Sequence, residues 1–178
     1  MGKEIYGVSP ENLSYKNGLA ISYSKLGGIY EATGDWKNAL LNYQERNKLG
    51  KEIYESSPEN LSYKNGLAIS YSKLGGIYEA TGDWKNALLN YQEDFRLTKE
   101  INEGSPENLS YKNGLAISYA KLAVLQEKLE ELIEAVSNME LALQLFKEVA
   151  DVFPENPSYQ NNLAWAVDNY NRLKSFIR

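Results

Sequence analysis

The chain has 178 residues, of which 43% are hydrophobic and 24% are charged, and it contains no cysteine and no histidine. This composition is typical of a folded protein, and it excludes disulfides, thiolate nucleophiles and the commonest metal ligand and general base. The net charge of −5 offers no basic footprint for nucleic acid, and no apolar run reaches the length of about 20 residues that a membrane span needs. The sequence shows no secretory signal, so we expect a cytoplasmic protein. From the composition and charge we expect a non-enzymatic protein that has no cofactor or metal and binds neither nucleic acid nor membranes.

An internal repeat of 48 residues organises the sequence. Residues 9–15 recur unchanged at 57–63 and 105–111, and more weakly at 153–159. One such unit cannot bury its own apolar face, so tandem units are expected to stack on one another as a solenoid. The first two blocks, 9–56 and 57–104, differ only at the pairs 46/94, 47/95, 48/96, 50/98, 54/102 and 56/104.

The repeat also sets the predicted domain organisation. Residues 2–6 repeat residues 50–54, which is expected for an excerpt from a longer array. We predict a single solenoid domain over 1–178. It comprises a stub at 1–8, repeats at 9–56, 57–104 and a divergent 105–152, and a C-terminal capping helix at 153–178.

In the first block, apolar residues recur at helical spacing and predict helix A, with Asn12 as its N-cap. The predicted core stripe is Leu19, Ala20, Tyr23, Leu26, Gly27 and Tyr30. The pair Asn17-Gly18 is usually a turn signal, but we place it inside helix A, where Gly18 would permit close backbone approach. Residues 33–35 predict a turn, and an amphipathic helix B follows from Trp36 to about Tyr54, with Trp36 and its repeat equivalent Trp84 predicted in the core.

The other blocks extend this pattern to an all-α, right-handed α-solenoid of about seven helices. Turns are expected near 33–35, 56–60, 81–83, 104–108, 128–131 and 153–157. The third block has no turn residue at 128–131, so its two helices either fuse into one rod or keep a hairpin; we favour the hairpin, because the block keeps its length.

The last helix is predicted to cap the solenoid. Its apolar residues Leu163, Ala164, Val167 and Tyr170 are expected to cover the preceding helix. Its polar residues Asp168, Asn169, Asn171 and Arg172 are expected to face water.

The motif Tyr23-Ser-Lys-Leu26-Gly27-Gly-Ile-Tyr30, followed by Gly34-Asp35-Trp36, Ala39 and Tyr43, resembles the tetratricopeptide repeat (TPR), in a long-helix variety. The resemblance implies a scaffold that binds a peptide or protein segment on a concave surface lined by the A helices. The candidate contacts carried over to that surface are Asn17, Ile21, Lys25, Glu31, Asn65, Ile69, Lys73, Glu79, Asn113, Ile117, Lys121 and Val124. The alternative for the three lysines is a solvated face, and small residues such as Ser24 and Gly28 are equally explained by close helix packing.

The expected partner is therefore a protein or peptide. The alternative is a self-associating structural repeat protein that forms head-to-tail assemblies or filaments through its ends. The first helix A lacks the preceding helix B that later A helices have, and the third helix B is apolar nearly all round, from Leu141 to Phe146.

Overall fold

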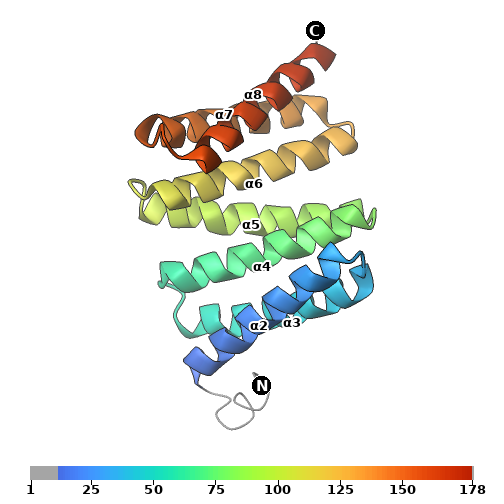
Figure 1. The fold of residues 1–178 in the computed structure, drawn as a ribbon, viewed down its shortest axis with the longest axis vertical. Coiled ribbons are helices and arrows are strands. Elements are labelled where there is room, and N and C mark those ends of the chain that lie inside the picture. Colours follow the sequence, from blue (N-terminus) through green and yellow to red (C-terminus); the bar gives the residue numbers. More distant parts are fainter. Residues whose placement is uncertain (1–11, 178) are drawn as a thin grey trace. The chain divides into compact units, whose positions relative to one another are not determined.

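A computed structural model describes residues 12–177, and over that range the chain folds into seven α-helices joined by short turns, with no strand (Figure 1). The helices are α2 (Leu13–Ala32), α3 (Trp36–Ser56), α4 (Leu61–Ala80), α5 (Trp84–Gly104), α6 (Leu109–Lys128), α7 (Leu132–Val152) and α8 (Pro157–Phe176). Each predicted turn lies within one residue of an observed one. The all-α, α-solenoid class predicted from the repeat is confirmed, and the protein is a helical-repeat protein.

The repeated asparagine explains where four of the helices begin. Asn12 Oδ1 accepts hydrogen bonds from the backbone N–H groups of Ser14 (2.9 Å) and Tyr15 (3.3 Å), which satisfies donors that the first helical turn leaves free. The same pair of bonds is made by Asn60, Asn108 and Asn156 at the starts of α4, α6 and α8.

The third block keeps its hairpin, so the favoured prediction is confirmed and the fused rod is not formed. Residues 129–131 separate α6 from α7. The turn needs a left-handed residue, and Glu130 takes that conformation with φ of 63°, where Gly34 and Gly82 have 75° and 77°. A residue with a Cβ is therefore held in a conformation that glycine adopts without cost.

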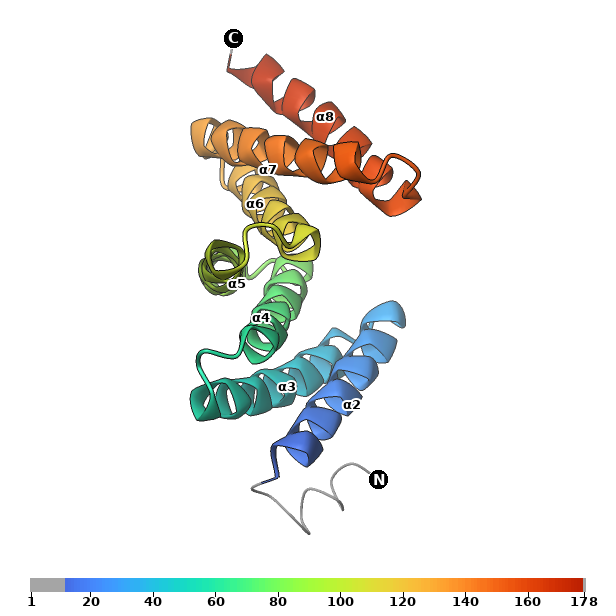
Figure 2. The same ribbon diagram turned by 90° about the vertical axis from the view of Figure 1, so that its left-hand side faces the viewer.

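The chain divides into two compact units, one ending at Leu97 and the other starting at Thr98, so the boundary lies inside α5. In the first unit, α3 packs against both α2 and α4 (Figure 2). In the second unit, α7 packs against both α6 and α8. None of the helices over residues 12–177 is long and apolar enough to cross a membrane.

The first unit has a core in which one helix approaches another at a glycine. Tyr43 and Ala39 of α3 are fully buried and pack with Leu74 and Ile77 of α4. The ring of Tyr43 also lies against Gly27 of α2, where an added Cβ would be only 2.5 Å from the ring. The glycine of the Leu-Gly pair in the motif is thus explained by the aromatic residue of the next helix.

Gly18 lies inside α2 as predicted, but the predicted close approach is wrong. Apart from its own helix backbone, a Cβ at Gly18 would meet no heavy atom of the described residues within 4 Å. The close approach occurs nine residues later, at Gly27.

Three predicted core residues are also exposed, so these predictions are wrong. Trp36 and Trp84 are 41% and 37% exposed, because each is the first residue of its helix, next to the turn, where the preceding helix has already ended. Leu26 is 45% exposed, although the stripe predicted it to be buried.

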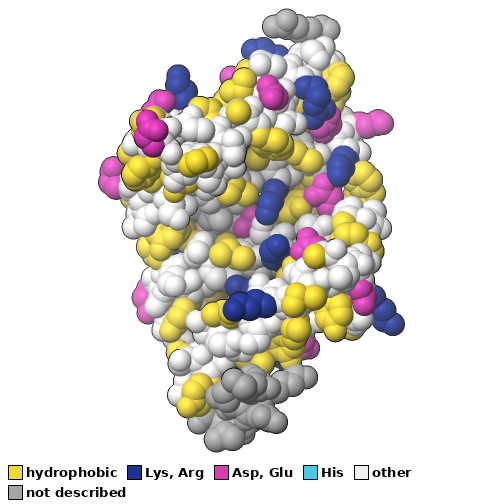
Figure 3. Space-filling view, in the orientation of Figure 1, with side chains coloured by type: hydrophobic (Ala, Val, Ile, Leu, Met, Phe, Trp, Pro, Cys, Tyr) yellow, Lys and Arg dark blue, Asp and Glu magenta, His cyan; other side chains and the backbone are white. Residues whose placement is uncertain are grey.

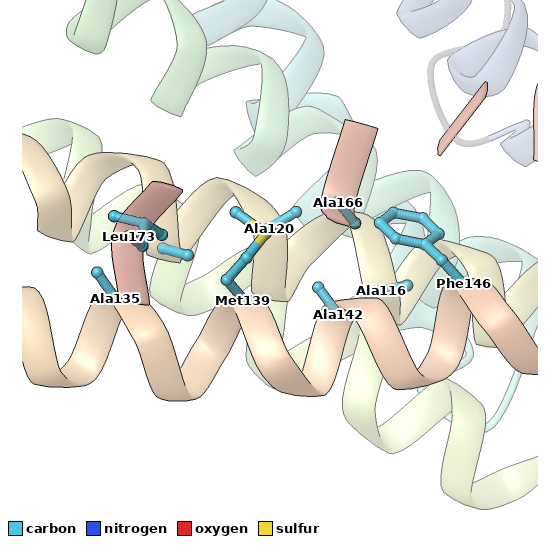
Figure 4. Packing of buried hydrophobic residues seen from close by; sticks show 9 residues of the cluster. Ala116, Ala120, Ala135, Met139, Ala142, Phe146, Ala166 and Leu173 are labelled. Atoms are coloured by element: carbon cyan, nitrogen blue, oxygen red, sulfur yellow. The ribbon is translucent and has the colours of Figure 1, made fainter. Parts of the chain in front are cut away.

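The second unit is built around an apolar cluster rich in alanine. Met139, Ala142 and Phe146 of α7 face Ala116 and Ala120 of α6, and α8 adds two buried side chains (Figure 4). Small side chains let the three helices approach closely, and Met139 and Phe146 fill the remaining space.

The residues by which α8 covers α7 differ in part from those predicted. Leu163 and Tyr170 pack against the cluster as expected, but Ala164 and Val167 are exposed. The fully buried positions are Ala166 and Leu173, which the predicted set omits. The face of α8 that meets α7 is therefore rotated from the predicted one. Of the polar residues predicted to face water, Asp168, Asn171 and Arg172 are exposed and Asn169 is half-buried.

Candidate functional site

Polar side chains are buried mainly where a helix B meets the next helix A. The buried polar or charged residues in the described part of the chain are Arg46, Asn47, Ser70, Asp94, Thr98 and Ser118. Four of them, Arg46, Asn47, Asp94 and Thr98, occupy positions at which the two nearly identical blocks differ. The few differences between the blocks thus lie largely in helix contacts and not on the solvent face.

In the first unit this contact is a small polar network between α3 and α4. Asn47 Nδ2 donates a hydrogen bond of 2.8 Å to Ser70 Oγ, and Ser70 Oγ donates one of 2.6 Å to the carbonyl of Leu67. Both side chains are buried and satisfied, so the pair fixes how α4 sits on α3.

Next to this network lies a cavity of about 50 Å³ bounded by three helices. It is lined by Asn17 and Ala20 of α2, Arg46, Gly50 and Ile53 of α3, and Ser62, Tyr63 and Gly66 of α4. Asn17 is one of the residues that the sequence predicted for ligand contact.

Arg46 is the feature of this cavity that sequence reasoning missed. Its side chain is buried, with the residue only 9% exposed, and its Nε has no hydrogen-bond partner within residues 12–177. Burial lowers the pKa of the guanidinium from its ordinary value, yet arginine stays protonated at neutral pH. The signal available in the sequence was that Arg46 differs from its repeat equivalent, Asp94.

The glycines around Arg46 make room for its guanidinium. A Cβ at Gly50 would lie 3.2 Å from Nη1, and one at Gly66 would lie 3.9 Å from Nη2. The neighbouring ion pair joins Lys16 of α2 to Glu52 of α3 at 2.8 Å. Glu52 is thus already paired with a lysine.

The predicted contact surface is open on the A helices of the first unit. Ile21 and Ile69 occupy matching positions and are 47% and 45% exposed. Lys25 and Lys73 are also exposed. Asn65 is half-buried. Apolar side chains therefore reach solvent at equivalent positions of α2 and α4.

The acidic members of the predicted surface are held by tyrosines of helix B. Tyr43 donates a hydrogen bond of 2.5 Å to Glu31, which also lies 3.7 Å from Lys73 Nζ. Tyr91 donates one of 2.7 Å to Glu79. Burial, together with the neighbouring carboxylate, raises the pKa of both tyrosines. Glu31 and Glu79 therefore contribute to packing within each hairpin.

In the second unit, α8 occupies much of the corresponding surface. Ile117 and Val124 pack against the apolar cluster, and Asn113 accepts a hydrogen bond of 3.3 Å from Asn162 of α8. Lys121 is half-buried. The predicted residues are thus accessible mainly in the first unit. On the face drawn in Figure 3, hydrophobic side chains are visible among polar and charged ones over the helices of each unit.

Comparisons with known proteins find similar solved structures but no matching family. No protein-family model matches the chain, and no curated protein matches it. Among solved structures, the chain is similar to a de novo designed helical repeat protein, with 17% identity over 93% of this chain and 82% of the other and a TM-score of 0.40. It is also similar to BtubC from P. vanneervenii, with 15% identity, 99% and 86% coverage and a TM-score of 0.42. A third similar structure is MamA, with 16% identity, 88% and 91% coverage and a TM-score of 0.33.

Proposed function

We propose that the chain is a non-catalytic, TPR-like scaffold that binds a peptide or protein segment on the exposed surface of its A helices. The observation that carries the proposal is the exposure of Ile21 and Ile69 at matching positions of α2 and α4, beside Lys25 and Lys73. When a partner covers an apolar side chain that is exposed to solvent, the free energy of the complex decreases. A repeated pair of such side chains suits an extended segment that crosses successive repeats.

The test compares proteins recovered from the source cell by the wild-type chain and by two double variants. In the first, Ile21→Glu and Ile69→Glu place charges on the proposed surface. In the matched control, Leu41→Glu and Leu89→Glu do the same on helix B, where these residues are 51% and 52% exposed. The proposal expects one partner to be lost with the first variant and kept with the control. If both variants keep every partner of the wild type, the A-helix surface is not the binding site.

A second candidate function, self-association, is favoured by a contrast between two helices of identical sequence. Leu74 and Ile77 of α4 are 6% and 1% exposed because α3 covers them. Their equivalents in α2, Leu26 and Ile29, are 45% and 60% exposed. The face that α4 presents to α3 is therefore open on α2.

We propose a second copy of the chain as the occupant of this face, with α2 paired against α2. Such a contact would be isologous and would close as a dimer. In the last helix, α8, the residues at the repeat positions of Gly27 and Tyr30 are Asn171 and Lys174. The surface of α8 at these positions is therefore more polar than that of α2. Pairing of like ends is thus favoured over head-to-tail growth.

Light scattering over a concentration series tests this candidate. The wild type is expected to approach twice the chain mass, and the Leu26→Glu, Ile29→Glu variant to remain a monomer. The Ile21→Glu, Ile69→Glu variant is the control and should still form the dimer. A wild-type mass equal to one chain at every concentration contradicts self-association, and a mass that grows without limit indicates a filament instead.

A further inference from the structure

We propose that the cavity between α2, α3 and α4 is a binding site for an oxyanion, a single phosphate or carboxylate group, held by the guanidinium of Arg46. This site is separate from the exposed A-helix surface, and nothing in the proposed scaffold function requires it.

The charge of Arg46 has no ion-pair partner within residues 12–177. A buried charge is costly unless it is paired and hydrogen-bonded. Arg46 is only 9% exposed, and its Nε is buried without a hydrogen-bond partner within residues 12–177. Arginine has five N–H donors and no acceptor, in a planar arrangement that matches two oxygens of a carboxylate or phosphate. An oxyanion bound in the cavity would pair with the positive charge of the guanidinium, which lies beside Gly50 and Gly66 of the lining.

The lining of the cavity consists of residues that suit an anion. Besides Arg46, the polar side chains are those of Asn17, Ser62 and Tyr63, all of which can donate a hydrogen bond. Within residues 12–177, no residue of the lining is acidic. The cavity therefore offers donors and one positive charge, and it lacks a carboxylate that would repel an anion.

The size of the cavity suits a small anion. A buried water needs a cavity of about 10–15 Å³. The cavity has about 50 Å³, which is enough for a group of a few heavy atoms and too little for an organic ligand of drug size. Glycines at positions 50 and 66 keep this space open, because a Cβ at either would lie within 4 Å of the guanidinium.

The repeats themselves provide a comparison. The equivalents of Arg46 are Asp94 in the second block and Ala142 in the third, and those of Gly50 are Thr98 and Phe146. In the third block, Ala142 and Phe146 are 0% and 3% exposed in the apolar cluster (Figure 4). The same contact can thus be filled by apolar side chains. The first block instead carries a cation and an open space.

The experiment uses the whole chain and inorganic phosphate as the probe, with acetate as the carboxylate probe. Melting temperature and titration heat are measured at constant pH and ionic strength, with chloride as the reference anion. We expect the wild type to gain melting temperature with phosphate or acetate, in a saturable way and with measurable heat. The Arg46→Met variant should melt higher than the wild type in chloride, because an unpaired buried charge is removed, and should show no saturable response.

Two further variants serve as controls. Lys48→Met removes an exposed positive charge from the same helix and should keep the wild-type response. Gly50→Phe copies the residue of the third block and should abolish the response by filling the space. Because phosphate also stabilises folded proteins in general, only the difference between the wild type and Arg46→Met counts.

The outcomes are decisive in both directions. A wild type without saturable binding, or an Arg46→Met variant that responds as the wild type does, overturns the proposal. A further arm with O-phosphoserine identifies the source of the group. If O-phosphoserine competes with phosphate for the site, the site accepts a phosphate group carried by a larger molecule. If phosphate binds and O-phosphoserine does not, the ligand is the free ion.

Discussion

The α-carbon of Gly27 lies against the ring of Tyr43, so that a methyl group added there would stand 2.5 Å from ring carbon Cε1. The same relationship recurs between Gly75 and Tyr91, again at 2.5 Å. Each pair joins a helix A to the helix B of its own hairpin. Each tyrosine hydroxyl donates a hydrogen bond to a glutamate of that same helix A. The spacing of glycine, glutamate and tyrosine in the repeat is thus one packing unit.

Alanine substitution at two glycines of α2 should have opposite effects. Gly27→Ala should destabilise the fold by about 1–3 kcal/mol, because the Tyr43 ring must move to admit a methyl group. Gly18→Ala should stabilise it by up to about 1 kcal/mol, because the helix gains a better helix former and, its own helix backbone aside, no atom of residues 12–177 lies within 4 Å of the added methyl group. Urea unfolding measures both, and a destabilised Gly18→Ala variant would mean that this position has a contact that the structure lacks.

The two glycines also illustrate what the sequence predicts and what it does not. Helical periodicity, asparagine caps and turn residues predict the helices to within about two residues, because those signals are local. Which glycine is contacted depends on a residue of another helix, and periodicity within one helix cannot supply it. For the same reason periodicity predicts Leu26 and Trp36 in the core, although both are exposed.

The candidate site was predictable only in part. Asn17 was named because it lies opposite the core stripe, and it does line the cavity. Arg46 was overlooked because an arginine on an amphipathic helix usually lies on the solvent face. Its burial results from the contact of α3 with α4, which only the assembled repeats reveal. The difference between Arg46 and Asp94 in otherwise matching blocks was the sole indication.

Replacing Glu130 by glycine should stabilise the chain. Glu130 has φ of 63° in the α6–α7 turn, where a left-handed conformation costs a residue with a Cβ about 1–2 kcal/mol and glycine much less. We expect a net gain of about 1 kcal/mol in thermal or urea unfolding. The reverse change, Gly82→Ala at φ of 77°, should destabilise by a similar amount. A loss of stability in Glu130→Gly would show that the glutamate side chain stabilises the turn.

The buried tyrosines should make stability fall at alkaline pH. Burial first, and then the hydrogen bond to a glutamate, raise the pKa of Tyr43 and Tyr91 in the folded state. Above the ordinary tyrosine pKa of about 10, the unfolded chain loses these protons while the folded chain keeps them, so unfolding becomes easier as pH rises. Below that pH neither state loses them, and this contribution does not vary with pH.

The comparison is between the wild type and the Tyr43→Phe, Tyr91→Phe variant, with melting temperatures measured from pH 8 to pH 11. The variant should lose less stability than the wild type between pH 10 and pH 11. Parallel curves for the two proteins would show that these tyrosines do not resist ionisation in the folded chain.

Because α2 and α4 have identical sequences, the same substitution can be compared on the open face of α2 and on the covered face of α4. Leu74→Ala should cost about 2–5 kcal/mol, because Leu74 is 6% exposed and its loss leaves a cavity against α3. Leu26→Ala changes the same residue in the same local sequence, but Leu26 is 45% exposed. At low protein concentration it should alter the free energy of unfolding by less than about 0.5 kcal/mol, as is usual for surface positions.

If two chains pair through α2, the cost of Leu26→Ala should increase with protein concentration, because only the dimer buries this side chain. Urea unfolding at several concentrations measures both effects, and equal costs for the two substitutions in dilute solution would mean that α2 is covered as α4 is.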